Sequence, residues 1–240
     1  MPNYQLVNNI DHQATRVITA RGAQYGDDVM FTMTFPSEMR SVQACYPILI
    51  YKDPDNGEFY PVAVFGFAQG ENLFLEGDCW NNSYIPIMIR RPPFLIGFQK
   101  PNPATEAQRV LTIDMNHPRV SESEGEALFL PQGGNSPFLE TMADMLEAIH
   151  SGNEDNKAFM ALLVKLDLVE SITLDITLND QSKNQLQGFY TLDDEKLQTL
   201  SSDALEELKN SGFLLPAFMM AASQSQLGKL IRLRNDKASV

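Results

Sequence analysis

Apolar and polar positions alternate over short distances in the first half of the chain, and this pattern predicts short strands joined by turns. The clearest pair of apolar runs, at 46–51 and 59–67, is separated by the sequence DPDNG at 53–57. Proline presets φ, and Asn-Gly accepts the positive φ that a tight turn needs. We therefore expect the two runs to form a β-hairpin.

Further short strands are expected on both sides of this hairpin. Runs of the same character lie at 16–19, 29–34, 73–75, 84–89, 95–98 and 110–114. The run at 84–89 ends at the sequence RRPP, where two prolines prevent a strand ladder from continuing and favour an extended or turn backbone. The first half of the chain is therefore predicted to be rich in β-structure.

The hydrophobic period changes to that of a helix at Ser136, which is a good N-cap residue followed by proline at the first helical position. Apolar residues then recur at i, i+4, i+7 and i+11, namely Phe138, Met142, Met145 and Ile149. This spacing predicts a helix that ends at Ser151-Gly152, followed by a second helix at 156–166.

The remainder of the chain combines one hairpin with helices. Strict alternation at 171–178 predicts a strand whose partner is the run at 186–192. Helices are expected at 193–200, at 203–210 before Gly212, and at 213–232, where Pro216 falls in the first turn and is tolerated.

This segregation of strands and helices predicts an α+β protein rather than a doubly wound sheet. We expect a β-rich N-terminal lobe at 1–115 and a C-terminal lobe of helix/β-hairpin/helix character at 136–240. The polar, glycine-punctuated segment 116–135 is interpreted as a linker or long surface loop.

Composition and charge narrow the range of functions. The 240 residues are 43% hydrophobic and 20% charged, as in a folded domain, and 31 acidic against 18 basic residues give a formal net charge of −13. An acidic surface repels phosphate backbones and anionic lipid, which argues against a nucleic-acid partner. The most apolar stretch, 213–222, has about half of the roughly 20 residues that a membrane span needs.

The cellular compartment of the protein is predicted from its cysteines and from its first residues. Cys45 and Cys79 are too few and too far apart for a metal knuckle or a disulfide framework, so two reduced thiols are expected. The first residues have neither a basic nor an apolar region typical of a secretory signal. A cytoplasmic protein is the resulting expectation, and the sequence gives no oligomeric state.

Common reaction motifs are missing from the sequence. It contains no Gly-x-Gly-x-x-Gly, no phosphate loop, no Gly-x-Ser-x-Gly and no His-Glu-x-x-His. The alternative left open is a metal-dependent enzyme that uses His12, Asp114 or His117, although solvated loop histidines explain the same residues. The leading expectation is no cofactor and no catalysis.

Three local features are candidates for ligand or partner binding. Glu71 and Asn72 occupy a turn between apolar runs, and turn formation alone is the favoured explanation for them. Trp80 stands beside two asparagines and offers either a stacking platform or a core side chain. Arginines 90 and 91 precede the two prolines and could bind a carboxylate or phosphate, or pair with an internal carboxylate. The predicted site spans this region and consists of Glu71, Asn72, Trp80, Tyr84, Arg90 and Arg91.

The same central stretch carries a family resemblance. The segments YPILI, PVAVFGF, GENLFL and IRRPPF, followed later by LDITLND, LQGFYTLDDEKLQTL and LLPAFMMAASQSQLGKL, resemble the SapC-like family of bacterial proteins. The resemblance covers roughly 11–232. One departure is Pro92, where relatives commonly have an aromatic residue.

The resemblance implies an accessory role rather than a reaction. The family takes its name from a surface-layer locus, and members tend to occur near halogenase-like, cupin-like and TonB-dependent-receptor proteins. The hypothesis is therefore a non-enzymatic binding or accessory protein that acts with a protein partner or a small ligand. A structural component associated with a surface layer is a further alternative.

Overall fold

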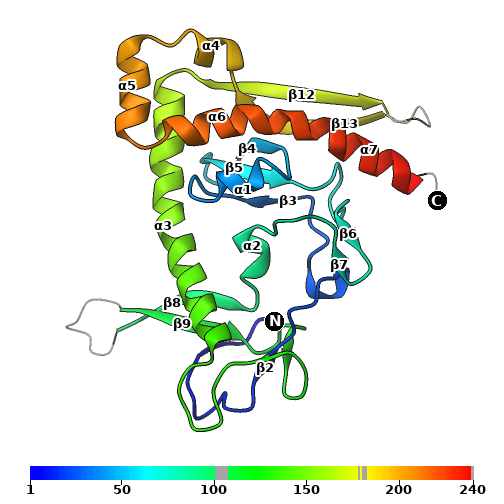
Figure 1. Cartoon of the computed structure of the whole chain (residues 1–240), viewed down its shortest axis with the longest axis vertical. Coiled ribbons are helices and arrows are strands. Elements are labelled where there is room, and N and C mark those ends of the chain that lie inside the picture. The colour runs from blue at the N-terminus through cyan, green and yellow to red at the C-terminus, as the bar shows by residue number, and fades with distance from the viewer. Residues whose placement is uncertain (101–107, 178, 180–182, 239–240) are drawn as a thin grey trace. The chain divides into compact units, whose positions relative to one another are not determined.

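The computed structural model describes residues 1–100, 108–177, 179 and 183–238 (Figure 1). It contains 36% helix and 24% strand, and the predicted α+β class is confirmed. Two compact units are formed from non-contiguous segments. Unit 1 comprises Met1–Asp27, Gly77–Cys79 and Ile87–Ser151, and unit 2 comprises Asp28–Glu76, Trp80–Pro86 and Gly152–Val240. Each unit thus draws on both of the predicted lobes, whose boundaries at 115 and 136 stay a prediction.

Unit 1 contains two small antiparallel sheets. The strands of the first are ordered β1 (Tyr4–Leu6), β9 (Gln108–Asp114) and β8 (Phe94–Gln99). Those of the second are ordered β10 (Val120–Ser121), β2 (Arg16–Val17) and β11 (Glu126–Ala127). A short 3₁₀ helix, η1 (Ala23–Tyr25), follows β2.

The segment 116–135, interpreted as a linker or long surface loop, lies within unit 1 and consists of loops and two short strands. Its strands β10 and β11 pair with opposite edges of β2. Arg119, immediately before β10, is only 2% exposed. The polar sequence concealed this arrangement because two-residue strands leave almost no hydrophobic period to detect.

One apolar run that was expected to be extended is helical. Residues 87–90 form the single turn α2 (Ile87–Arg90), in which the Arg91 amide donates to the Ile87 carbonyl at 2.9 Å. A proline on each side, Pro86 and Pro92, confines the helix to this one turn, because proline suits a helix start and opposes the helical conformation of the residue before it.

A five-stranded antiparallel sheet forms the centre of unit 2. Its strands are ordered β12 (Val169–Thr177), β13 (Lys183–Leu192), β4 (Ile48–Lys52), β5 (Phe59–Val64) and β3 (Phe31–Met33). The β4–β5 hairpin is confirmed, and its turn contains Gly57 at a φ of 74°. The predicted strand at 171–178 corresponds to β12, although residue 178 lies outside the described residues.

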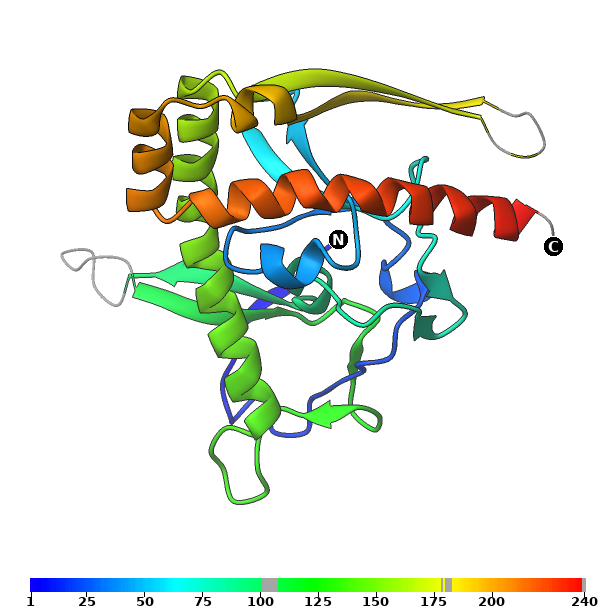
Figure 2. The same ribbon diagram turned by 45° about the horizontal axis from the view of Figure 1, so that its top comes forward.

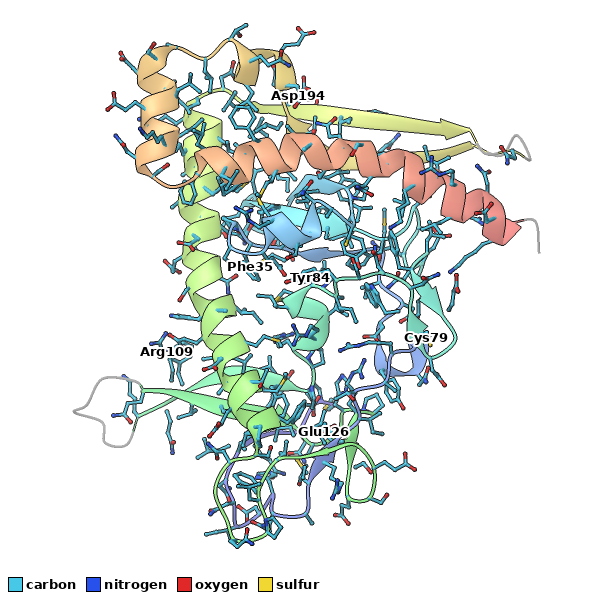
Figure 3. All side chains as sticks on the ribbon, in the orientation of Figure 1. Phe35, Cys79, Tyr84, Arg109, Glu126 and Asp194 are labelled. Atoms are coloured by element: carbon cyan, nitrogen blue, oxygen red, sulfur yellow. The ribbon has the colours of Figure 1, made fainter. Side chains whose placement is uncertain are left out.

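The two helices predicted at 136–151 and 156–166 are one helix, α3 (Pro137–Lys165). The predicted cap is confirmed, because the Ser136 hydroxyl accepts from the Leu139 amide at 3.2 Å. Gly152 does not end the helix. A Cβ built there would lie 2.6 Å from Cδ1 of Phe35, which is labelled in Figure 3, so the glycine permits close packing instead.

Unit 2 also contains a short helix that was not predicted, α1 (Met39–Val42). Its C-terminal helices follow the predicted order and are α4 (Asp194–Gln198), α5 (Ser202–Asn210), α6 (Leu214–Ser223) and α7 (Leu227–Ala238). The helix expected at 213–232 is divided by the 3₁₀ turn η2 (Gln224–Gln226), and α6 and α7 run in sequence along the sheet (Figure 2). Pro216 lies in the first turn of α6 as predicted.

The core of unit 2 is aliphatic and aromatic. Fully buried side chains include Phe35, Tyr46, Ile48, Phe65 and Phe159. Two short strands, β6 (Leu75–Glu76) and β7 (Cys79–Trp80), complete the elements. Both cysteines are free, Cys45 in a buried position and Cys79 in an exposed one. Across the described residues, no helix has the length and apolar character that a bilayer crossing requires.

Candidate anion-binding site

Unit 1 contains a cavity of about 230 Å³ whose wall is half apolar and half polar. Three arginines and two threonines provide the polar part. The complete lining is Val17, Ile18, Thr19, Arg21, Arg90, Pro92, Arg119, Phe138, Thr141 and Met142. The convergence of three guanidiniums from distant parts of the chain makes this cavity the candidate site.

Arg119 is the most deeply buried of the three arginines. Its Nη2 lies 2.7 Å from Oδ2 of Asp27, and the exposed fractions of the two side chains are 2% and 4%. Its Nη1 donates to the carbonyls of Ile18, at 3.0 Å, and Ala20. Its guanidinium also lies 4.7 Å from the centroid of the Tyr25 ring. Within the described parts of the chain, the buried Nε of Arg119 has no hydrogen-bond partner.

Arg21 shares the same carboxylate. Its Nη1 lies 3.6 Å from Oδ1 of Asp27 and donates to the Ile89 carbonyl at 3.0 Å. Burial, followed by the charge of Arg119, lowers the pKa of the Arg21 guanidinium, while Asp27 opposes this and Arg90 adds to it. Asp27 is fixed in turn by the Gly22 amide, which donates to Oδ2 at 3.0 Å.

Arg90 completes the cluster at the C-terminal end of α2. No carboxylate of the described residues lies within ion-pair distance of its guanidinium. Two of the three guanidiniums, those of Arg21 and Arg119, therefore share the carboxylate of Asp27, and the cluster has two positive charges in excess. Because arginine stays protonated at any physiological pH, such a cluster is suited to binding and orienting an anion rather than to transferring protons.

The first turns of α3 supply the apolar side of the cavity. Phe138, Thr141 and Met142 stand at i, i+3 and i+4, so they lie on one face of the helix. Phe138 also packs against Phe94, with 6.2 Å between ring centroids. The periodicity that predicted a core-facing helix thus also directs an aromatic ring and a thioether toward the arginines.

The predicted pair Arg90 and Arg91 differs in surroundings. Arg90 lines the cavity, whereas Arg91 does not. The Nε of Arg91 is buried without a hydrogen-bond partner among the described residues, and burial lowers the pKa of its guanidinium. Neither arginine forms an ion pair with a described carboxylate, so the interpretation as an internal salt bridge is not supported.

The predicted residues Glu71 and Asn72 lie in unit 2 and make local structural contacts. One carboxylate oxygen of Glu71 lies 3.1 Å from Nε of Arg234, and the other accepts from the Phe67 amide at 2.7 Å. The buried side chain of Asn72 accepts from the Phe74 amide at 3.0 Å. These bonds account for both side chains within the turn.

Trp80 and Tyr84, also in unit 2, belong to a buried polar network. The Trp80 indole is 9% exposed, and its N–H donates to the Tyr46 hydroxyl at 2.7 Å. That hydroxyl donates to the Tyr84 carbonyl, and the Tyr84 hydroxyl donates to Oε2 of Glu38 at 2.9 Å. Burial raises the pKa of Tyr46. The indole is therefore a core side chain and is not exposed for stacking on a ligand.

Sequence reasoning missed Arg21, Arg119 and Asp27. Each stands alone in a polar segment, and no local spacing connects them. The only signal was general: a buried arginine needs a carboxylate partner, but the sequence does not say which arginine is buried. The strand order β10-β2-β11 places the segments that contain these residues together.

The residues of the metal alternative are engaged in local hydrogen bonds. Asp114 accepts from the Asn3 amide at 2.7 Å, and Nδ1 of His117 accepts from the Arg119 amide at 3.2 Å. His12 is buried, and its Nε2 has no hydrogen-bond partner in the portion of the chain described. In that same portion, no three side chains of histidine, cysteine, aspartate or glutamate are arranged to hold a metal ion.

Comparison with known proteins assigns the family. No curated protein and no solved structure is detectably similar to this chain. The SapC family model, in contrast, matches residues 7–230 of the 240. The match spans both units, including the segments that line the arginine cavity. The chain therefore belongs to the SapC family.

Proposed function

We propose that the protein is a binding protein that holds an anionic ligand in the arginine cluster of unit 1. The observation that carries this proposal is the excess of guanidinium groups, three against one carboxylate, around a cavity. Buried charges are normally paired, because removing a charge from water without compensation is costly. A bound anion would compensate the excess.

The overall charge of the chain strengthens this argument. With 31 acidic and 18 basic residues, the protein has carboxylates in surplus. Internal pairing could have neutralised every arginine, yet the described carboxylates leave Arg90 unpaired. Local electropositive clusters in acidic proteins attract anionic ligands and exclude cationic ones. The cluster is therefore better explained by recognition than by stability.

The three arginines have different roles in the proposed binding of an anion. Asp27 holds Arg119 and Arg21 in place, and the backbone acceptors at Ile18, Ala20 and Ile89 fix their orientation. Arg90 is the remaining guanidinium, and its planar fork can make two parallel hydrogen bonds to an oxyanion. Arg90 therefore makes the main contact with the ligand in this proposal.

The accessory character of the protein is a further part of the proposal. Membership of the SapC family and the resemblance to proteins found beside halogenase-like, cupin-like or TonB-dependent-receptor systems support a role with such a partner. A binding protein that presents or buffers a small anion suits this context. The ligand is the part of the proposal that can be tested directly.

Isothermal titration calorimetry on the full chain tests the proposal with three probes, namely sodium acetate, sodium benzoate and inorganic phosphate. At least one of them should bind with one-to-one stoichiometry, and affinity should fall as salt is added. In Arg90→Gln, affinity should fall about tenfold or more, because a charge-assisted pair is lost.

Arg91→Gln is the matched control, since it removes the same charge from the adjacent residue, which does not line the cavity. Its affinity for the probes should equal that of the parent. Equal losses in both variants would point to a general charge effect and contradict a specific role for Arg90. No binding of any of the three anions would refute the proposal.

A further inference from the structure

We infer that the ligand of the arginine cavity is a small monocarboxylate with an apolar ring or branched body. This inference rests on the proposed function and deepens it, because it specifies the chemical class of the anion. It follows from the donors that remain free in the cluster, from the apolar part of the cavity lining and from the size of the cavity.

The free donors match the two oxygens of a carboxylate. Asp27 and backbone carbonyls already occupy much of Arg21 and Arg119. The fork of Arg90 forms no ion pair with a carboxylate of the described segments and is available to a ligand. A planar fork satisfies a planar, two-oxygen group.

Arg119 contributes to the site through its charge. Its side chain is 2% exposed, and its Nε is buried without a hydrogen-bond partner in the described segments. Arg119 lines the cavity, so its guanidinium favours a negatively charged group there.

The apolar part of the cavity lining selects the body of the ligand. Five of the ten lining residues are apolar, and they come from β2, the residue that follows it, the proline after α2, and α3. Phe138 and Met142 present an aromatic ring and a polarizable thioether on one helical face. Such surfaces stabilise a ring or branched alkyl group by removing it from water. A bare inorganic anion would leave this surface unused.

The cavity volume limits the size of the ligand. Pockets for drug-sized molecules have volumes of about 300–1,000 Å³. The cavity of about 230 Å³ is smaller, and so it suits a single ring or branched chain with one carboxylate. Extended molecules such as peptides and nucleotides exceed this volume.

The test compares five probes on the unmodified full chain by calorimetry, namely acetate, benzoate, benzamide, phenyl phosphate and inorganic phosphate. Benzoate should bind about tenfold or more tightly than acetate, because the ring loses contact with water. Benzamide, which has the same shape without the charge, should show no measurable binding. Both phosphates should bind more weakly than benzoate.

A pair of variants tests whether the ring of the ligand packs against helix α3. Phe138→Ala should reduce the preference for benzoate over acetate to about onefold and leave acetate affinity unchanged. Phe98→Ala is the matched control, because this phenylalanine of unit 1 is 67% exposed and does not line the cavity. Arg90→Gln should weaken benzoate and acetate by the same factor.

The outcomes separate this inference from the proposed function. If acetate or phosphate binds but benzoate is no tighter than acetate, the apolar body of the ligand is wrong, the inference fails and anion binding stands. Tighter binding of phenyl phosphate than of benzoate also overturns the inference. If no anion binds, both statements fail. The probe series uses the unmodified chain, so it decides the matter even if Phe138→Ala does not fold.

Discussion

Two polar regions of the protein differ in how their hydrogen bonds and charges are balanced. In unit 2, Trp80 donates to Tyr46, and the Tyr84 hydroxyl donates to Glu38. In unit 1, three guanidiniums line one cavity but only two of them pair with a carboxylate, that of Asp27, and the Nε of Arg119 has no acceptor among the described residues. The first region is a network whose members bond to one another, and the second has donors in excess.

This difference distinguishes structural polarity from binding polarity. A buried network whose members bond to each other adds specificity and rigidity to the core. A cluster with surplus charge can instead be compensated by a bound anion, as we propose for unit 1. An aromatic residue beside polar neighbours therefore says less about function than the ratio of donors to acceptors around it.

The largest expected effect tests the charge balance of unit 1. Asp27→Ala leaves the buried Arg119 without its carboxylate and should lower the free energy of unfolding by about 3–5 kcal/mol. Urea denaturation measures the change. Asp28→Ala, at the adjacent position, should change stability by less than about 0.5 kcal/mol. An Asp27→Ala variant as stable as the parent would show that the pair does not hold the cluster together.

The next effect tests the network of unit 2. Tyr46→Phe removes both the acceptor of the Trp80 N–H and the donor to the Tyr84 carbonyl, so the free energy of unfolding should fall by about 1–3 kcal/mol. Benzoate affinity, measured by calorimetry below the unfolding transition, should not change. Tyr60→Phe is the control, since within the described residues the Tyr60 hydroxyl has no hydrogen bond. A loss of benzoate affinity in Tyr46→Phe would erase the distinction between the two regions.

A smaller effect is expected at Glu71, one of the residues predicted to bind a ligand. Glu71→Gln replaces its half-exposed ion pair with Arg234 by a neutral contact, and the free energy of unfolding should fall by about 0.2–1 kcal/mol. Glu76→Gln, on the neighbouring strand β6, provides the control for the loss of one charge. If Glu71→Gln weakens benzoate binding and Glu76→Gln does not, the turn that contains Glu71 contributes to ligand binding after all.

The sequence predicted those elements whose signals are local. The serine cap at Ser136 and the DPDNG turn act over a few residues, so a single sequence reveals the start of α3 and the β4–β5 hairpin. The length of α3 was mispredicted because the role of Gly152 depends on Phe35, which is remote in the sequence. A glycine that ends a helix and one that admits a neighbouring ring look the same without the partner.

The candidate site was predictable only in part for the same reason. Arg90 drew notice because two arginines precede two prolines. Its partners Arg21 and Arg119 lie in segments that are remote in the sequence and are brought together by the pairing of β2 with β10 and by the hydrogen bonds of Arg119. Pairing between two-residue strands leaves no periodic pattern in the sequence. The excess of positive charge arises only when the chain folds and brings these arginines together, so the sequence does not reveal it.

The smallest expected effect concerns pH and His117. Burial, followed by the charge of Arg119, lowers the pKa of this histidine; Asp114 and Asp27 oppose the shift, and Arg91 adds to it. As pH falls below the ordinary value of about 6.5, the unfolded chain takes up a proton before the folded chain does, so stability is greatest above this pH and declines toward the lower folded pKa. Because water screens a half-exposed group, the decline should stay below about 0.5 kcal/mol.

Comparing the parent with His117→Gln tests this effect by urea unfolding at several values between about pH 5 and about pH 7.5. The variant should lack this part of the decline, so that the difference in stability between the two proteins changes with pH. Protonated His117 also adds a positive charge beside Arg119, so benzoate should bind the parent slightly more tightly at the acidic end, and the variant should not show this gain. If the two proteins have parallel stability profiles and parallel benzoate affinities, His117 is uncoupled from the arginine cluster, and the charge excess of unit 1 is confined to the three guanidiniums that line the cavity.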